Sequence, residues 1–164
     1  MIEENQSRRA LEEAIRFEMD GRQFFLKAAE KAKTYFAKTI FQIIAEEELD
    51  HIRKVEQIYE SDFASKKQGG SSWTSKKSNL QNVFQEAKEK MDQTLSMNAD
   101  ELEAIRLAVQ LEFKGQEFYK RLAEEATTDF EKAFYQHLAQ EESVHFSILR
   151  QMEDAVRNAT SLGW

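Results

Sequence analysis

The sequence predicts an all-α protein, a four-helix bundle built from two duplicated helical hairpins that a long crossover joins. Apolar residues recur at helical spacing over four long stretches, and the 164 residues include no proline and only five glycines. The second half repeats the first at an offset of 94 residues (18 to 112), so that residues 17–32 align with 111–126. A repeat of this kind predicts two equivalent hairpins that face each other across a pseudo-twofold axis.

The first hairpin is predicted to occupy about residues 7–61. Its first helix should begin near Ser7 and run to about Lys33, and its second should run from Thr34 to about Ser61. Serine and threonine are favoured at the first position of a helix, where the side-chain oxygen accepts a hydrogen bond from a free backbone N–H group.

The second hairpin is predicted to occupy about residues 98–158. Its first helix should begin at Asn98, with Glu101 three residues later, and its second at Thr128, with Glu131 three residues later. Both spacings are typical of a capping box, in which two side chains satisfy the free N–H groups of one helix end. The turn inside this hairpin aligns with the turn of the first.

The residues between the hairpins, about 62–97, have a different composition. Residues 61–79 are rich in serine, lysine and glycine, which is typical of an exposed connection. A shorter amphipathic helix is predicted to follow, with an apolar face made of Leu80, Val83, Phe84, Ala87, Met91 and Leu95. Residues 1–164 are therefore expected to form one domain.

Composition excludes several kinds of protein. The formal net charge is −7 and no basic stripe is present, so nucleic acid is not expected as a partner. The absence of cysteine excludes disulfides, iron–sulfur clusters and thiolate metal sites within these residues. The first residues lack the apolar region of a signal peptide, and no apolar stretch is long enough to span a membrane. We therefore expect a cytoplasmic protein without a membrane partner.

Six polar residues interrupt the apolar stripes of the predicted helices. The first and third helices each carry one glutamate, and the second and fourth each carry a Glu-x-x-His step, which places both side chains on one helix face. In both halves the lone glutamate precedes the glutamate of the pair by 30 residues (18 to 48, 112 to 142). The six residues are Glu18, Glu48, His51, Glu112, Glu142 and His145.

Together these six residues predict a site for two metal ions. Burying a carboxylate without a partner costs several kcal/mol, and two divalent cations would balance the charge of four carboxylates. An oxygen-rich ligand set with one imidazole per ion suits iron or manganese, and zinc is possible but less natural. The neighbouring Glu46, Glu47 and Glu141 fall off the apolar stripes and are expected to be solvated.

Four further residues bear on the interpretation of these six. Gly21 and Gly115 each lie three residues after a lone glutamate, where a glycine either leaves room for an oxidant or permits close helix packing. Tyr119 lies two turns after Glu112 on the same face and is a candidate catalytic residue, the alternative being a core aromatic. His137 lies outside the constellation and is expected at the surface or in packing.

On these motifs the chain resembles the rubrerythrins of the ferritin-like superfamily, over nearly all its length except the linker and the tail. The resemblance implies a homodimer that binds two irons per chain through the six residues and reduces hydrogen peroxide. It further implies that Glu48 and Glu142 bridge the two irons, and that Glu18, His51, Glu112 and His145 are terminal ligands.

The chain departs from the rubrerythrin pattern in two ways. It has no cysteine-rich rubredoxin domain, so a separate electron-donor protein is expected. Gly115 stands where rubrerythrins have an additional glutamate, and the remaining ligand set is similar to the ferroxidase centre of bacterioferritin. The expected function is therefore a di-iron peroxidase or oxidoreductase. A ferroxidase or iron-storage protein and a di-iron oxygenase are the alternatives, with hydrogen peroxide or dioxygen as the oxidant.

Overall fold

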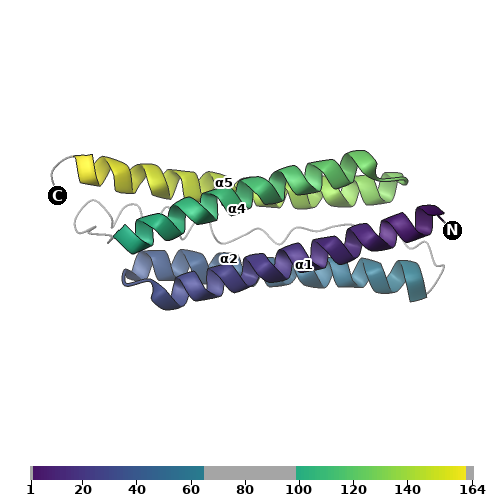
Figure 1. The fold of residues 1–164 in the computed structure, drawn as a ribbon, viewed down its shortest axis with the longest axis horizontal. Helices are drawn as coiled ribbons and strands as arrows, with labels where there is room; N and C mark the ends of the chain where they lie inside the picture. Colours follow the sequence, from purple (N-terminus) through teal and green to yellow (C-terminus); the bar gives the residue numbers. More distant parts are fainter. Residues whose placement is uncertain (1, 65–98, 162–164) are drawn as a thin grey trace.

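The computed structural model describes residues 2–64 and 99–161, which fold into four long helices with no strand among them. Helices α1 (Ile2–Lys31) and α2 (Tyr35–Ala64) form one hairpin, and α4 (Ala99–Glu125) and α5 (Asp129–Ser161) form the other. The two hairpins are stacked on each other, with antiparallel helices inside each (Figure 1). The predicted all-α, ferritin-like four-helix bundle is confirmed.

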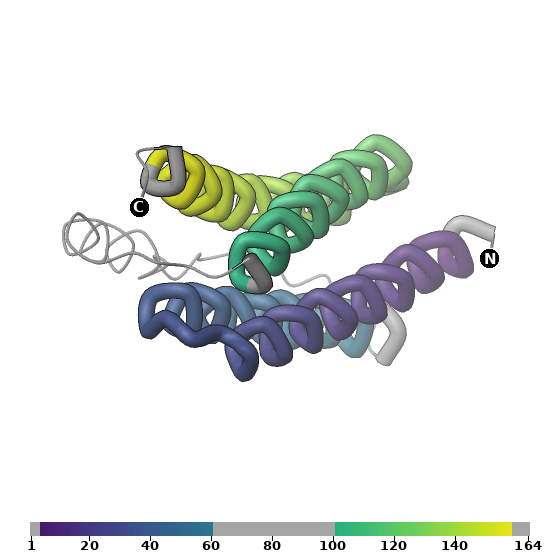
Figure 2. Tube along the Cα trace, turned by 60° about the vertical axis from the view of Figure 1, so that its left-hand side comes forward, coloured from purple at the N-terminus to yellow at the C-terminus, as the bar shows by residue number. Residues whose placement is uncertain are grey.

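The order of the helices requires a crossover between the hairpins. Helix α2 ends at one end of the bundle and α4 begins at the other, so a tight turn cannot join them (Figure 1). As Figure 2 also shows, α1 lies beside α4 and α2 lies below α5. The predicted short helix over residues 80–95 lies outside the described residues, as does most of the predicted linker 61–79. Its first residues, 61–64, belong to α2, so the second helix is longer than predicted.

Threonine side chains cap two of the helices, as the sequence predicts. The hydroxyl oxygen of Thr34 accepts a hydrogen bond of 3.3 Å from the backbone N–H of Ala37. The hydroxyl oxygen of Thr128 accepts one of 3.1 Å from the N–H of Glu131. The prediction for α1 is less accurate, because this helix begins at Ile2 and not at Ser7.

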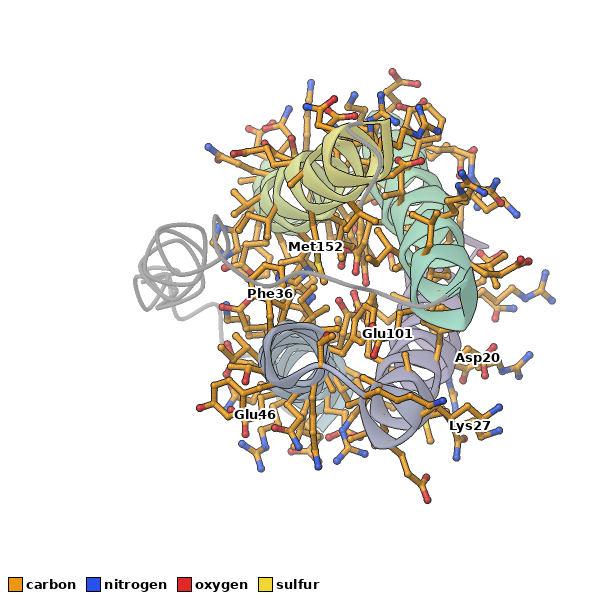
Figure 3. All side chains as sticks on the ribbon, turned by 90° about the vertical axis from the view of Figure 1, so that its left-hand side faces the viewer. Asp20, Lys27, Phe36, Glu46, Glu101 and Met152 are labelled. Atoms are coloured by element: carbon orange, nitrogen blue, oxygen red, sulfur yellow. The ribbon has the colours of Figure 1, made fainter. Side chains whose placement is uncertain are left out.

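The beginning of α2 has a second cap, which comes from the other hairpin. The buried carboxylate of Glu101 on α4 accepts hydrogen bonds from the backbone N–H groups of Lys33 and Thr34, the second at 2.8 Å. Figure 3 shows Glu101 between the two hairpins. The sequence assigned this residue to the cap of its own helix, whereas its negative charge lies at the positive end of α2. Glu101 therefore ties the hairpins together.

The core consists of two apolar layers separated by the six polar residues. On α1 the buried Leu11 belongs to one layer and Phe25 to the other, with Glu18 between them. On α2 Ile44 and Val55 flank the Glu-x-x-His step in the same way. On α4 and α5, buried apolar residues of the two layers likewise lie on either side of the polar residues. A polar layer therefore crosses the middle of the bundle.

Candidate metal centre

The four helices bring all six predicted residues together in the polar layer. Each of them is at most 2% exposed. Every helix contributes from its core-facing stripe: one glutamate from each of α1 and α4, and a glutamate with a histidine one turn later from each of α2 and α5. The residues are Glu18, Glu48, His51, Glu112, Glu142 and His145.

Their ligand atoms form two overlapping groups, in each of which all atoms lie within 4.8 Å of one another. The first group consists of Glu18, Glu48, His51 and Glu142. The second group consists of Glu48, Glu112, Glu142 and His145. Glu48 and Glu142 belong to both groups. Since a carboxylate has two oxygens, these two residues lie where they can bridge two ions.

The histidines present Nδ1 to the centre of the layer. Nδ1 of His51 lies 3.2 Å from Oε1 of Glu142 and 3.4 Å from Oε2 of Glu18. Nδ1 of His145 lies 3.3 Å from Oε1 of Glu48. The two imidazole rings are stacked, with centroids 5.7 Å apart. Both halves of the bundle thus place a nitrogen beside carboxylate oxygens in the same way.

Each of the six residues has a buried oxygen or nitrogen atom without a hydrogen-bond partner in the described part of the chain. Buried polar atoms in folded proteins almost always have a partner, so a cluster of unsatisfied atoms fits metal ions in that role. Carboxylate oxygens with one imidazole nitrogen per group suit iron or manganese. The atoms are Oε2 of Glu18, Oε1 of Glu48, Nδ1 of His51, both oxygens of Glu112, Oε1 of Glu142 and Nδ1 of His145.

Without a metal, crowding favours protonation of two of the carboxylates. Burial raises the pKa of Glu48 well above its usual value, and the charges of Glu142 and Glu18 raise it further. Burial and Glu142 likewise raise the pKa of Glu112. For His51, burial alone would lower the pKa. The negative charge of Glu18 and hydrogen bonds with neighbouring carboxylates outweigh burial and raise the pKa well above its usual value. Cations binding here therefore replace protons.

The outer nitrogen of each histidine contacts a glutamate of the opposite hairpin. Nε2 of His51 lies 2.5 Å from Oε2 of Glu141, and Nε2 of His145 lies 2.5 Å from Oε2 of Glu47. Both glutamates are only 22% exposed, so the expectation that they are solvated is wrong, whereas Glu46 is exposed. A carboxylate at Nε2 fixes the ring and leaves the Nδ1 lone pair for a metal.

The sequence held a signal for these two residues. Glu47 and Glu141 are separated by the same offset as the ligand candidates, and each directly precedes a candidate bridging glutamate. Their partners could not be read from it, because each contacts the histidine of the other hairpin and not the one on its own helix.

Glu141 belongs to a larger charge network on its side of the bundle. Nζ of Lys54 lies 3.3 Å from its carboxylate and Nε2 of His137 lies 3.1 Å from it. Burial alone would raise the pKa of this carboxylate, but the hydrogen bond and charge of His51, followed by the other two neighbours, lower it to about 2. Ile148 and Ile43 take the places of Lys54 and His137 in the repeat. The surroundings of the two histidines therefore differ.

Tyr119 also makes the two halves differ. Its hydroxyl donates a hydrogen bond to Oε1 of Glu18, and the side chain is completely buried. Burial, and then the negative charge of Glu18, raise the pKa of Tyr119 well above its usual value, so the hydroxyl keeps its proton. The equivalent residue in the first half is Phe25, which has no hydroxyl.

The two glycines lie beside the shared carboxylates. A Cβ atom on Gly21 would lie 3.2 Å from Oε2 of Glu48. A Cβ atom on Gly115 would lie 3.2 Å from Oε2 of Glu142 and 3.0 Å from the ring of Phe17. Both glycines thus leave space for a carboxylate of the cluster, and Gly115 also lets α1 pack closely on α4.

The fold and the cluster define a class of protein: a ferritin-like helical bundle whose buried carboxylates and imidazoles can hold metal. The chain belongs to the rubrerythrin family, because the family model described as Rubrerythrin matches residues 9–106. The matched range contains Glu18, Glu48 and His51, and ends before Glu112. The internal repeat extends the pattern to the second half.

A solved structure of a hypothetical protein from Pyrococcus furiosus is similar to this chain. The similarity covers 93% of this chain and 90% of the other, with a TM-score of 0.68 and 24% sequence identity, and it supports the fold. No curated protein matches the chain. Within residues 2–64 and 99–161, none of the helices has the length and apolar character needed to cross a membrane.

Proposed function

We propose that the protein is a non-haem di-iron oxidoreductase that reduces hydrogen peroxide with electrons from a separate donor protein. The observation that carries this proposal is the sharing of Glu48 and Glu142 by both ligand groups. Two ions held close together need carboxylates that reach both of them. Membership of the rubrerythrin family, which typically binds iron, supports iron as the metal.

In this proposal each hairpin provides the terminal ligands of one ion. Glu18 and His51 would hold the first ion, Glu112 and His145 the second, and the shared glutamates would bridge them. The four carboxylates balance the charge of two ferrous ions. When bound, these ions would supply the two electrons that, with two protons, convert one hydrogen peroxide to two water molecules.

The surrounding residues hold the ligands in place. Glu141 and Glu47 accept hydrogen bonds from Nε2 of the two histidines, which keeps Nδ1 directed to the centre. The hydroxyl of Tyr119 donates to Glu18 and restricts the rotation of that carboxylate. We therefore assign Tyr119 as a positioning residue. The apolar layers on both sides exclude bulk water from the ligands.

Ferroxidase activity is the second candidate, and the surroundings of Gly115 favour it. A Cβ at this position would lie 3.0 Å from the ring of Phe17 and 3.2 Å from Oε2 of Glu142, so a glutamate here would require these two side chains to shift. The described residues thus offer six ligands, and the glycine at position 115 does not supply the additional rubrerythrin carboxylate. A set of six is similar to the ferroxidase centre of bacterioferritin.

Stopped-flow absorbance separates the two activities. The protein is loaded without oxygen with two ferrous ions per chain and mixed with hydrogen peroxide or with dioxygen. Much faster oxidation by peroxide is expected from a peroxidase. Faster oxidation by dioxygen that continues when ferrous iron is added would support the ferroxidase instead.

A bridging ligand and a matched neighbour test the ligand assignment. Glu48→Ala should abolish oxidation by either oxidant and lower the iron content for both ions, because Glu48 belongs to both groups. Glu46→Ala is the control, since Glu46 is exposed on the same helix. Two tightly bound irons and a full oxidation rate in Glu48→Ala would rule out the assignment.

A further inference from the structure

A groove on the outer side of the second hairpin combines apolar side chains with basic ones. It has a volume of about 370 Å³ and lies between α4 and α5. The side chain of Phe113 is 50% exposed there, and its ring lies 5.8 Å from the ring of Phe146. The lining residues are Val109, Gln110, Phe113, Lys114, Phe146 and Arg150.

Arginines continue the basic character beyond the groove. The buried carboxylate of Glu153 is 2.9 Å from Arg150, 2.8 Å from Arg157 and 3.8 Å from Arg106. Each of the three guanidinium groups remains about half exposed beside this carboxylate. With Lys114, these residues form a basic surface on a chain that has 30 acidic and 23 basic side chains.

The repeat supplies an internal comparison for this surface. On the first hairpin the places of Lys114 and Arg150 are taken by Asp20 and Glu56, both exposed. One lining position has the opposite change, because Arg16 takes the place of a glutamine. Figure 3 shows Asp20 on the outside of the bundle. The basic groove therefore belongs to the second hairpin and is not a general property of the fold.

The groove is closely connected to the second ligand group. Phe113 directly follows Glu112, and Phe146 directly follows His145. In each pair the glutamate or histidine is buried in the cluster while the phenyl ring lines the groove. A single peptide unit thus separates a surface side chain from a side chain of the cluster.

We propose that this groove docks a small acidic electron-transfer protein that reduces the metal centre. The inference rests on the proposed function. Two molecules of a one-electron donor each lose one electron, and the two electrons return both ions to the ferrous state without forming or breaking a bond in the chain. Acidic side chains around the donor's redox centre pair with Lys114 and Arg150, and an apolar contact covers Phe113. Charge pairs of this kind accelerate and orient association.

Binding to the metal-free protein tests the groove independently of activity. The labelled chain is titrated by NMR with oxidised rubredoxin and, separately, with oxidised flavodoxin, two acidic electron carriers, at low ionic strength. Shift changes are expected at residues 107–114 and 146–150 and should disappear at high salt. Lys114→Glu should raise the Kd about tenfold or more through like-charge repulsion. Asp20→Lys, at the equivalent position of the first hairpin, should leave the shift changes of the groove residues unaltered.

Reduction kinetics separate the docking surface from the proposed function. In the oxidised iron-loaded protein, Lys114→Glu should slow reduction by the carrier and leave reduction by dithionite unchanged. If dithionite cannot reduce the centre of the wild-type protein, the proposed function fails, while the binding result still decides the groove.

Three results would overturn the docking proposal. The first is absence of binding by both carriers at low ionic strength. The second is a Kd that Lys114→Glu leaves unchanged. The third is a change in oligomeric state in Lys114→Glu without an effect on carrier binding, which would make this groove a contact between copies of the chain.

Discussion

The imidazole of His51 is held at both nitrogens, by carboxylates near Nδ1 and by Glu141 at Nε2. Glu141→Gln keeps the shape of this contact. It removes the negative charge of the carboxylate, which strengthens the hydrogen bond donated by Nε2. We expect metal affinity to fall about 10- to 100-fold, the usual effect of losing such a partner, mainly for one of two ions. Metal titration calorimetry measures this, with Glu46→Gln as the control. Two ions bound with unchanged affinity would contradict the role of Glu141.

Tyr119 restricts only one of the two terminal carboxylates. Tyr119→Phe removes a hydrogen bond to a buried charged group, an interaction of about 1.5–3 kcal/mol, so metal affinity should fall by a factor of about 10 to 150. Tyr59→Phe is the control, because the Tyr59 hydroxyl bonds Glu12 outside the cluster. Equal losses of affinity in the two variants would mean that Tyr119 acts only through general stability.

For individual side chains, the sequence could predict which six residues meet, because the repeat and the apolar stripes determine the helix face on which each lies. It could not predict the role of Glu47 and Glu141. A residue next to a core-facing position lies at the edge of the stripe, and its exposure depends on how closely the facing hairpin approaches. The contact of Tyr119 with Glu18 is likewise between hairpins, and helical spacing alone left its role open.

Among the helix ends, the first turn of α2 depends most on the other hairpin. Glu101→Ala would leave the N–H groups of Lys33 and Thr34 without their carboxylate partner. Loss of a cap costs about 1–2 kcal/mol, and we expect the upper end because the acceptor is buried. Urea unfolding measures the loss, and metal content should not change. Glu103→Ala, an exposed neighbour, is the control. A loss as small as that of the control would contradict the cap.

The ends of the helices also show what local sequence can and cannot predict. Thr34 and Thr128 cap their own helices, so the residues next to them in the chain suffice to identify them. The carboxylate of Glu101 satisfies N–H groups more than 60 residues away in the chain, and only the packing of the start of α4 on the first turn creates that contact.

Over the whole molecule, the buried polar layer makes the stability of the metal-free protein depend on pH. Glu48 and Glu112 have raised pKa values in the folded protein. Their stabilising contribution is complete below the ordinary carboxylate pKa and is lost as pH rises through the raised values. His51 and His145 also have raised pKa values and act in the same direction. The free energy of unfolding should therefore fall between about pH 5 and pH 8.

Metal should remove this dependence, because the ions take the place of the protons. Urea unfolding at several pH values, with and without bound metal, measures the difference. The lowered pKa values of Glu141 and Glu18 act in the opposite direction, but their contribution is lost only below the ordinary carboxylate pKa, outside this pH range. Metal-free Glu48→Gln is the control and should show a flatter profile. A metal-free protein whose stability increases through neutral pH would contradict this account.

Placing both hairpins on one polypeptide allows them to diverge. In an assembly of two identical hairpins, every substitution would appear twice and the two ion positions would stay the same. Here Tyr119 takes the place of Phe25, and Lys54 that of Ile148, so the ligand group with Glu18 and His51 has a hydroxyl and an ammonium where the repeat places apolar side chains. Duplication followed by such changes makes the two ligand groups chemically different, and we expect them to differ in affinity for metal.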